Sequence, residues 1–255
     1  MQPSTPLTNQ LPPGIAAPVL LMLPGMVCGP ASWQQQAEAL AGNVQIVIAD
    51  YDSADNITVM ARQLLAFFDA PLLLAGHSMG ARVALEIYRL APHRVLGLCL
   101  IATESRARPE GERGQAEDST RMGLLKLAVD QGMQAMANAW IPALLGPRSQ
   151  NDRRVQDALR AMISAHSVET LAHHIEAGRT RPDAHALLSS ITCPTLLIAG
   201  EQDVLRPPAL LEEMHLAITH SRFLVIEGCG HMPTMEAPES INLAMQTWLT
   251  QSLSR

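Results

Sequence analysis

Short apolar runs alternate with amphipathic helical patterns along most of the chain, and this alternation restricts the fold more than any other feature of the sequence. The apolar runs cover residues 19–23, 44–49, 72–76, 95–101, 195–200 and 222–227. Runs without polar alternation fit strands covered on both faces, as in a parallel sheet. Helical patterns lie between them at residues 30–41, 56–69, 79–91, 207–217 and 238–250. This order predicts an α/β fold with a doubly wound, mostly parallel sheet.

The interval between Thr103 and Ile191 breaks the rhythm, because it contains no strand-like run and is rich in Met, Ala, Gln and charged residues. An all-helical block inserted after a strand lies where open α/β sheets bind ligands. Packing on the core without a catalytic part is the alternative. We predict a flexible leader of residues 1–18, a core of residues 19–103 and 191–255, and a helical cap, or lid, of residues 104–190. The helices of the cap are expected at residues 115–131, 133–145, 152–165 and 168–178.

Composition excludes several classes of protein. The 255 residues are 47% apolar and 16% charged, as in a globular chain, and the net charge of −6 provides no basic surface for nucleic acid or anionic membranes. No apolar run approaches the ~18–20 residues of a membrane helix, and the first residues lack the basic start of a secretory signal. The four cysteines are widely spaced without CxxC pairs, which favours reduced thiols in the cytoplasm.

Ser78 stands in the pentapeptide GHSMG, between the apolar run at 72–76 and the helical pattern at 79–91. A Gly-x-Ser-x-Gly sequence between a strand and a helix is typical of a tight turn that exposes a nucleophilic serine. A structural serine in a glycine-permitted bend is the alternative. The strand before it and the helix after it favour the nucleophile.

Three further loops follow predicted strands and should therefore reach the same edge of the sheet. Asp203 follows the run at 195–200, and His231 lies in a glycine-bounded loop after the run at 222–227. Glycines after the first run allow backbone N–H groups to turn inward, at Met26 in particular. A histidine within reach of a serine takes its proton, and a carboxylate fixes the histidine tautomer. Glu201 and Glu104 are rival acids.

These blocks resemble the α/β-hydrolase superfamily: GHSMG around Ser78, GEQDVLRPP around Asp203 and GCGHMPTMEAPE around His231. The C-terminal blocks look most like small bacterial carboxylesterases and enol-lactonases. The resemblance implies that Ser78 is the nucleophile, His231 the general base and acid, and Asp203 its orienting partner. It also implies an oxyanion hole from the N–H groups of Met26 and Met79, and no metal or organic cofactor.

The chain departs from this pattern in two places. Many relatives have His-Gly after the first core strand, where this chain has Pro24 and Gly25. The proline-rich leader shows no obvious opening β-hairpin, so the sheet is expected to have fewer strands than usual. Candidates for the substrate pocket are Trp140, Met136, Leu144 and His77. Ordinary helix packing is the alternative for the first three, and a hydrogen-bonding role for the histidine.

The sequence therefore predicts a serine hydrolase that cleaves a small-molecule ester, thioester or lactone through an acyl-Ser78 intermediate. Carbon–carbon bond hydrolysis and cofactor-free perhydrolysis on the same triad are alternatives, and a non-catalytic ligand-binding protein is a remote one. Arg82 and Arg106 lie near the expected site, with surface solvation as their default interpretation. An arginine facing Ser78 would indicate an acidic substrate, whereas a methionine and leucine pocket would indicate an acyl chain or neutral ring. The sequence leaves the oligomeric state open.

Overall fold

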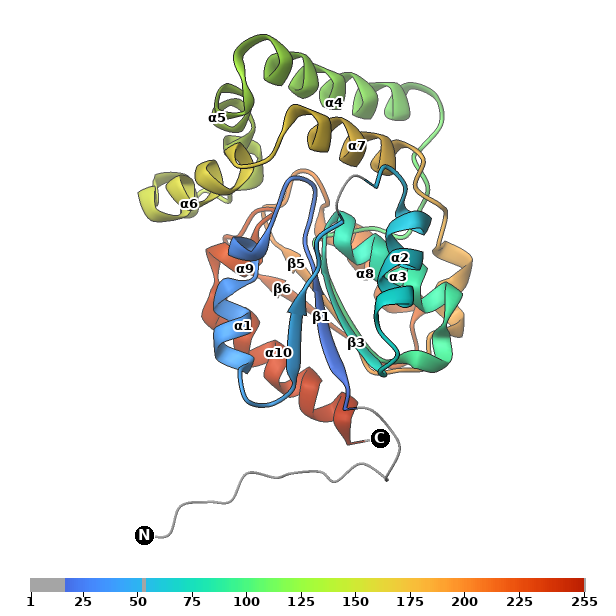
Figure 1. Cartoon of the computed structure of the whole chain (residues 1–255). Helices are drawn as coiled ribbons and strands as arrows, with labels where there is room; N and C mark the ends of the chain where they lie inside the picture. Colours follow the sequence, from blue (N-terminus) through green and yellow to red (C-terminus); the bar gives the residue numbers. More distant parts are fainter. Residues whose placement is uncertain (1–16, 52–53, 255) are drawn as a thin grey trace, which may run out of the picture.

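The computed structural model describes residues 17–51 and 54–254. Its six strands form one parallel sheet in the order β2-β1-β3-β4-β5-β6 (Figure 1). The strands are β1 (Val19–Leu23), β2 (Gln45–Ile48), β3 (Leu72–His77), β4 (Val95–Ile101), β5 (Thr195–Gly200) and β6 (Ser221–Ile226). The predicted α/β fold with a parallel sheet is confirmed. Residues 1–16 of the predicted leader lie outside the described residues.

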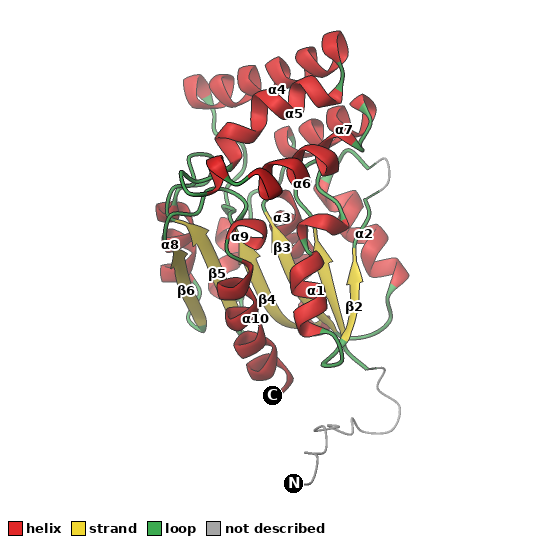
Figure 2. Ribbon diagram, turned by 90° about the vertical axis from the view of Figure 1, so that its left-hand side faces the viewer, coloured by secondary structure: helices red, strands yellow, loops and turns green. Residues whose placement is uncertain are grey.

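Helices cover both faces of the sheet (Figure 2). They are α1 (Gln34–Leu40), α2 (Ile57–Phe67), α3 (Met79–Leu90), α8 (Pro208–Ala217), α9 (Pro233–Glu236) and α10 (Pro238–Leu253). Alternate side chains of β1 explain the two layers, since Leu21 belongs to an apolar cluster with side chains of α2, α3 and α8, whereas Met22 belongs to one with side chains of α1 and α10. The inner strands β1, β3, β4 and β5 are buried along almost their whole length, which is why they read as continuous apolar runs.

Four further helices lie between β4 and β5 and stand beyond the carboxyl ends of the strands (Figures 1 and 2). They are α4 (Gly111–Gln131), α5 (Met133–Leu144), α6 (Arg153–Ser164) and α7 (Val168–Arg179). Their apolar side chains form a third cluster, which includes Val27 and Met232 from core loops. Helix α4 begins four residues before its predicted start, where Gly114 packs closely on the carbonyl of Pro109. No helix within the described residues is long and apolar enough to cross a membrane.

Short 3-10 turns complete the chain at Pro30–Ser32, Pro92–Arg94, Ser149–Asn151 and His185–Ser190. The strand order changes direction between β1 and β3, which are hydrogen-bonded neighbours. In open α/β sheets this switch point is where ligands bind. The loop after β1 carries Met26 and the turn after β3 carries Ser78, so the fold places both beside the switch point.

Candidate active site

Ser78 occupies a strained turn between β3 and α3, with φ of 53° and ψ of −112°. A non-glycine residue rarely adopts this region, and such strain is commonest at functional sites. Two glycines make the turn possible. A Cβ at Gly76 would lie 2.5 Å from the backbone of Ala81, and a Cβ at Gly80 would lie 2.0 Å from the carbonyl oxygen of Leu23. The turn is fixed further by the Ser78 N–H, which donates to Ile101 O at 2.8 Å.

His231 lies between the other two residues of the predicted triad. Its Nε2 is 3.0 Å from Ser78 Oγ, and its Nδ1 is 2.7 Å from Asp203 Oδ2. Asp203 and His231 are buried, with 3% and 5% of their surfaces exposed. Hydrogen-bond donation from Nδ1–H to the carboxylate leaves Nε2 free to accept the serine proton. Three residues separated by up to 153 positions therefore meet in one hydrogen-bonded chain.

The surroundings of Asp203 keep it ionised. Burial by itself raises the pKa of this carboxyl, but the neighbouring His231 and the N–H groups of Leu205 and Arg206 lower it below its usual value overall. The rival acids have other partners. Glu201 accepts a hydrogen bond from the N–H of Gly228, and Glu104 pairs with Arg82 and Arg206.

The loop after β1 carries the predicted oxyanion donor Met26. Its N–H makes no hydrogen bond within residues 17–51 and 54–254. Met79 is the first residue of α3, so its N–H has no partner inside the helix. The next residue of the loop, Val27, has a positive φ of 46° and donates its N–H to Nδ1 of His174, on α7. Tyr51 donates its hydroxyl to Pro24 O at 3.0 Å.

His174 and Tyr51 thus fix the shape of a loop that replaces the His-Gly of many relatives with Pro24 and Gly25. Because Val27 N–H donates to Nδ1, the His174 ring carries its hydrogen on Nε2. Burial lowers the pKa of His174 to about 4, and neighbouring histidines lower it in the same direction. The imidazole therefore stays neutral and keeps accepting at neutral pH.

His77 holds the backbone of His231 by a hydrogen bond and does not line the substrate pocket. Its ring is 1% exposed, and its Nε2 is 2.7 Å from the carbonyl oxygen of His231, to which it donates. Burial lowers its pKa to about 3, and the adjacent His231 adds to the effect. Its Nδ1 has no hydrogen-bond partner among the described residues. The predicted hydrogen-bonding role therefore describes the side chain better than the pocket role does.

Glu236 also holds the His231 loop, and sequence analysis did not single it out. One carboxylate oxygen accepts from the N–H groups of Gly230 and Met232, on either side of the histidine. The other accepts from the N–H of Gly146, just after α5. The quoted block GCGHMPTMEAPE contains this glutamate, and its position at the end of the one-turn helix α9 is the signal that was available.

A pocket that is partly open to solvent adjoins Ser78, and its lining differs from the predicted one. In the described structure none of Trp140, Met136, Leu144 and His77 lines it. Met136, Trp140 and Leu144 point into the third apolar cluster, because α5 packs on its neighbours through that face. The lining consists of Met26, Ser78, Met79, Arg82, Glu117, Asp118, Arg121, His174, Ile175, Gly178, Arg179, Arg181 and Arg206. Arginine is therefore the commonest residue around the nucleophile.

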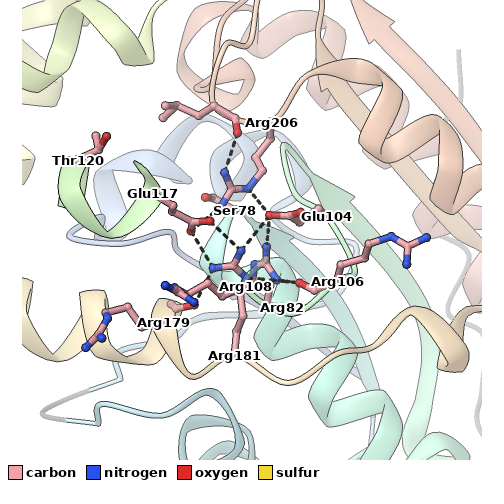
Figure 3. Close-up of polar contacts among 12 residues, drawn as sticks. Ser78, Arg82, Glu104, Arg106, Arg108, Glu117, Thr120, Arg179, Arg181 and Arg206 are labelled. Carbon is pink, nitrogen blue, oxygen red and sulfur yellow. Dashed lines mark hydrogen bonds and ion pairs between the residues drawn. The ribbon is translucent and has the colours of Figure 1, made fainter. Parts of the chain in front are cut away.

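The two arginines noted in the sequence differ in position. Arg82 is 8% exposed and lines the cavity, contrary to its default interpretation as a solvated residue, because α3 directs it under the cap toward Glu104. Arg106 is half exposed, pairs with Glu213 and extends away from the other arginines (Figure 3).

No cluster of three or more histidine, cysteine or acidic residues suited to a metal ion occurs in the part of the chain that the structure describes. Cys28 and Cys229, which lie in loops beside the site, are free thiols. Burial raises the pKa of each to about 12.

The fold and the site define an esterase-type hydrolase built on a parallel α/β sheet. A model of the alpha/beta hydrolase family matches residues 20–242, and the chain belongs to that family. The resemblance predicted from the sequence is therefore confirmed, and so is the prediction of an enzyme.

Individual relatives agree with this assignment. A pimeloyl-acyl-carrier-protein methyl ester esterase from Neisseria meningitidis is 26% identical over 211 residues, 83% of this chain and 80% of that protein. An esterase from Thermogutta terrifontis, solved with malate bound, is 28% identical with a TM-score of 0.83, over 94% of this chain and 91% of that one. An enol-lactonase from Burkholderia xenovorans shares the fold, with a TM-score of 0.80, 20% identity and 92% of each chain covered.

Proposed function

We propose that the protein is a serine hydrolase that cleaves an ester, thioester or lactone through an acyl-Ser78 intermediate. The observation that carries the proposal is the hydrogen-bonded chain from Ser78 Oγ through His231 to Asp203, with distances of 3.0 and 2.7 Å. As Oγ bonds to the substrate carbonyl carbon, Nε2 of His231 takes its proton. The ionised Asp203 stabilises the resulting imidazolium.

The negative charge that develops on the carbonyl oxygen is stabilised by the N–H groups of Met26 and Met79. Neither N–H donates to another described residue, and that of Met79 lies at the positive end of the α3 dipole. His231 then returns its proton to the leaving group, which departs and leaves the acyl-serine. A water molecule, deprotonated by His231, attacks this ester and releases the acid and free Ser78.

We further propose that residues 104–190 act as a lid that shapes the substrate pocket. The lid contributes Glu117, Arg121 and Arg181 to the cavity at Ser78, and its His174 holds the oxyanion loop. The names of the relatives support esters as the substrate class. The cytoplasmic location predicted from the cysteine pattern stays a prediction.

Turnover of short p-nitrophenyl esters tests the proposal. Ser78→Ala removes the nucleophile and should abolish nearly all turnover, whereas Ser254→Ala, at the exposed end of α10, should leave it unchanged. Retention of wild-type activity in Ser78→Ala would overturn the proposal. Parallel assays with an enol-lactone, a vinylogous diketone and a peroxide-plus-acetate mixture separate ester cleavage from carbon–carbon hydrolysis and perhydrolysis.

A further inference from the structure

A partly buried network of arginines and glutamates lies beside Ser78 and takes no part in the proposed chemistry. Glu104 Oε1 lies 2.7 Å from Arg82, 3.1 Å from Arg206 and 3.5 Å from Arg181. Glu117 Oε1 lies 2.7 Å from Arg181 and 3.6 Å from Arg206. These residues come from α3, α4 and the segments that follow β4, α7 and β5, and they converge under the lid (Figure 3).

Both glutamates of the network are paired with arginines, but the arginines outnumber the glutamates. Three arginines share two carboxylates, and a fourth arginine, Arg121, lines the same cavity from α4. Two further arginines, Arg108 and Arg179, have their charges balanced by carboxylates. Arg179 contacts Asp118 and Glu176, and Arg108 also contacts Asp118. Two positive charges are therefore in excess next to the nucleophile, in a chain whose net charge is −6.

Arg121 is the residue of this group that lacks a partner. Its guanidinium lies over the ring of Trp140, 5.5 Å from the ring centroid, and makes no hydrogen bond or ion pair with a described residue. Stacking on the indole holds the group in place without using its N–H donors. Burial and the nearby Arg206 lower the pKa of Arg121 to about 10, so the guanidinium remains charged at neutral pH.

A charged guanidinium that is partly withdrawn from water and has unused donors is costly unless an anion fills the space beside it. Its planar donors fit a carboxylate or phosphate in a two-point contact. The crowding of Arg82, Arg121, Arg181 and Arg206 adds to the attraction, because an anion there offsets their mutual repulsion.

We propose that the ester cleaved at Ser78 carries a carboxylate or phosphate group, which Arg121 binds within the arginine-lined cavity. This inference rests on the proposed function and names its substrate class. Arg121 acts in binding and recognition, at a distance from the reacting bond. The anion is recognised by the lid while the carbonyl carbon lies at Ser78, so the same contact orients the substrate.

The test compares two substrates of equal shape and different charge. One is the mono-p-nitrophenyl ester of adipic acid, and the other is its neutral isostere, in which an isopropyl group replaces the carboxylate. The wild-type protein should have at least about tenfold higher kcat/KM for the anionic ester, and the preference should fall with added salt. Arg121→Gln should reduce the preference at least about tenfold, and Arg121→Lys should retain part of it. Arg113→Gln, an exposed arginine of the same helix, is the matched control and should leave the preference unchanged.

A binding measurement separates this inference from the proposed chemistry. Calorimetric titration of Ser78→Ala with adipate and with pentyl phosphate should show binding that Arg121→Gln abolishes, and the tighter ligand identifies the anion. Equal kcat/KM for the two esters, or an Arg121→Gln variant that behaves like Arg113→Gln, would overturn the inference. Ester turnover that survives Ser78→Ala would instead overturn the proposed function, whatever the titration shows.

Discussion

Replacing Gly80 with alanine should damage both the stability and the activity of the enzyme. The added Cβ would lie 2.0 Å from Leu23 O and 2.6 Å from Pro24 O. Real Cβ contacts essentially never fall below 3.0 Å, so the backbone must shift by about 1 Å. Because both atoms belong to the main chain, no side-chain rotation can relieve the contact. Overpacking of this kind costs about 1–3 kcal/mol.

The matched control is Gly123→Ala. Gly123 lies inside α4 and a Cβ there would meet nothing within 4 Å, so it should gain about 0.5–1 kcal/mol from helix propensity alone. Gly80 also lies in a helix, so the same gain is included in its net effect. The melting temperatures of the two variants should differ by at least about 3 °C, since each kcal/mol shifts a chain of this size by about 2–4 °C.

The activity should respond more strongly than the stability. A shift of about 1 Å at Leu23 and Pro24 moves the loop that carries the Met26 N–H, and displacements of this size cost about a hundredfold. Thermal melts and kcat/KM for a p-nitrophenyl ester measure the two effects. A Gly80→Ala variant as stable and as active as Gly123→Ala would refute the assignment of Gly80 to the close contact between α3 and β1.

Two other substitutions test the groups around His231. Glu236→Gln keeps the size of the side chain but weakens the hydrogen bonds that hold the His231 loop. The kcat should therefore fall about tenfold with little change in KM. An unchanged kcat would show that the loop holds its shape without the carboxylate. His77 has a folded pKa of about 3, below the usual value near 6.5, so the unfolded state binds a proton first as the pH falls. The free energy of unfolding should therefore decline by about 1.4 kcal/mol per pH unit from pH 6.5 downward. Urea unfolding of His77→Gln should show a shallower decline. Parallel pH dependences of the wild type and the variant would contradict a buried neutral His77.

The residues at the carboxyl edge of the sheet could be predicted from the sequence, because the parallel topology places the loops that carry them. Once Val19–Leu23, Leu72–His77, Thr195–Gly200 and Ser221–Ile226 are parallel strands, the loops that follow them must converge. The two glycines of GHSMG indicate a tight turn at Ser78, and this can be recognised from residue types alone. The meeting of Ser78, Asp203 and His231 follows from these two facts.

The lid was less accessible to this reasoning. Its helices could be located, but the direction of each side chain depends on how α4, α5 and α7 rotate against one another. Trp140 and Met136 were expected in the pocket and instead pack into the apolar cluster, whereas Arg121 faces the cavity. The hydrophobic pattern of α4 is too weak to fix its inward face, because the helix is polar on nearly all sides.

Contacts that join the lid to the core were also hidden from the sequence. His174 accepts from Val27 across 147 positions, and Glu236 accepts from Gly146 across 90. Each depends on a buried polar atom finding a partner in the assembled fold, and no local spacing encodes it.

Covalent labelling by a fluorophosphonate, read by intact-protein and peptide mass spectrometry, tests the central claim most directly. An activated serine forms a stable bond with this reagent, whereas an ordinary serine in a bend does not. The account predicts one label per native chain, located on the peptide containing Ser78, and none on Ser78→Ala or on denatured protein. A native chain that hydrolyses esters but remains unlabelled at Ser78 would contradict it.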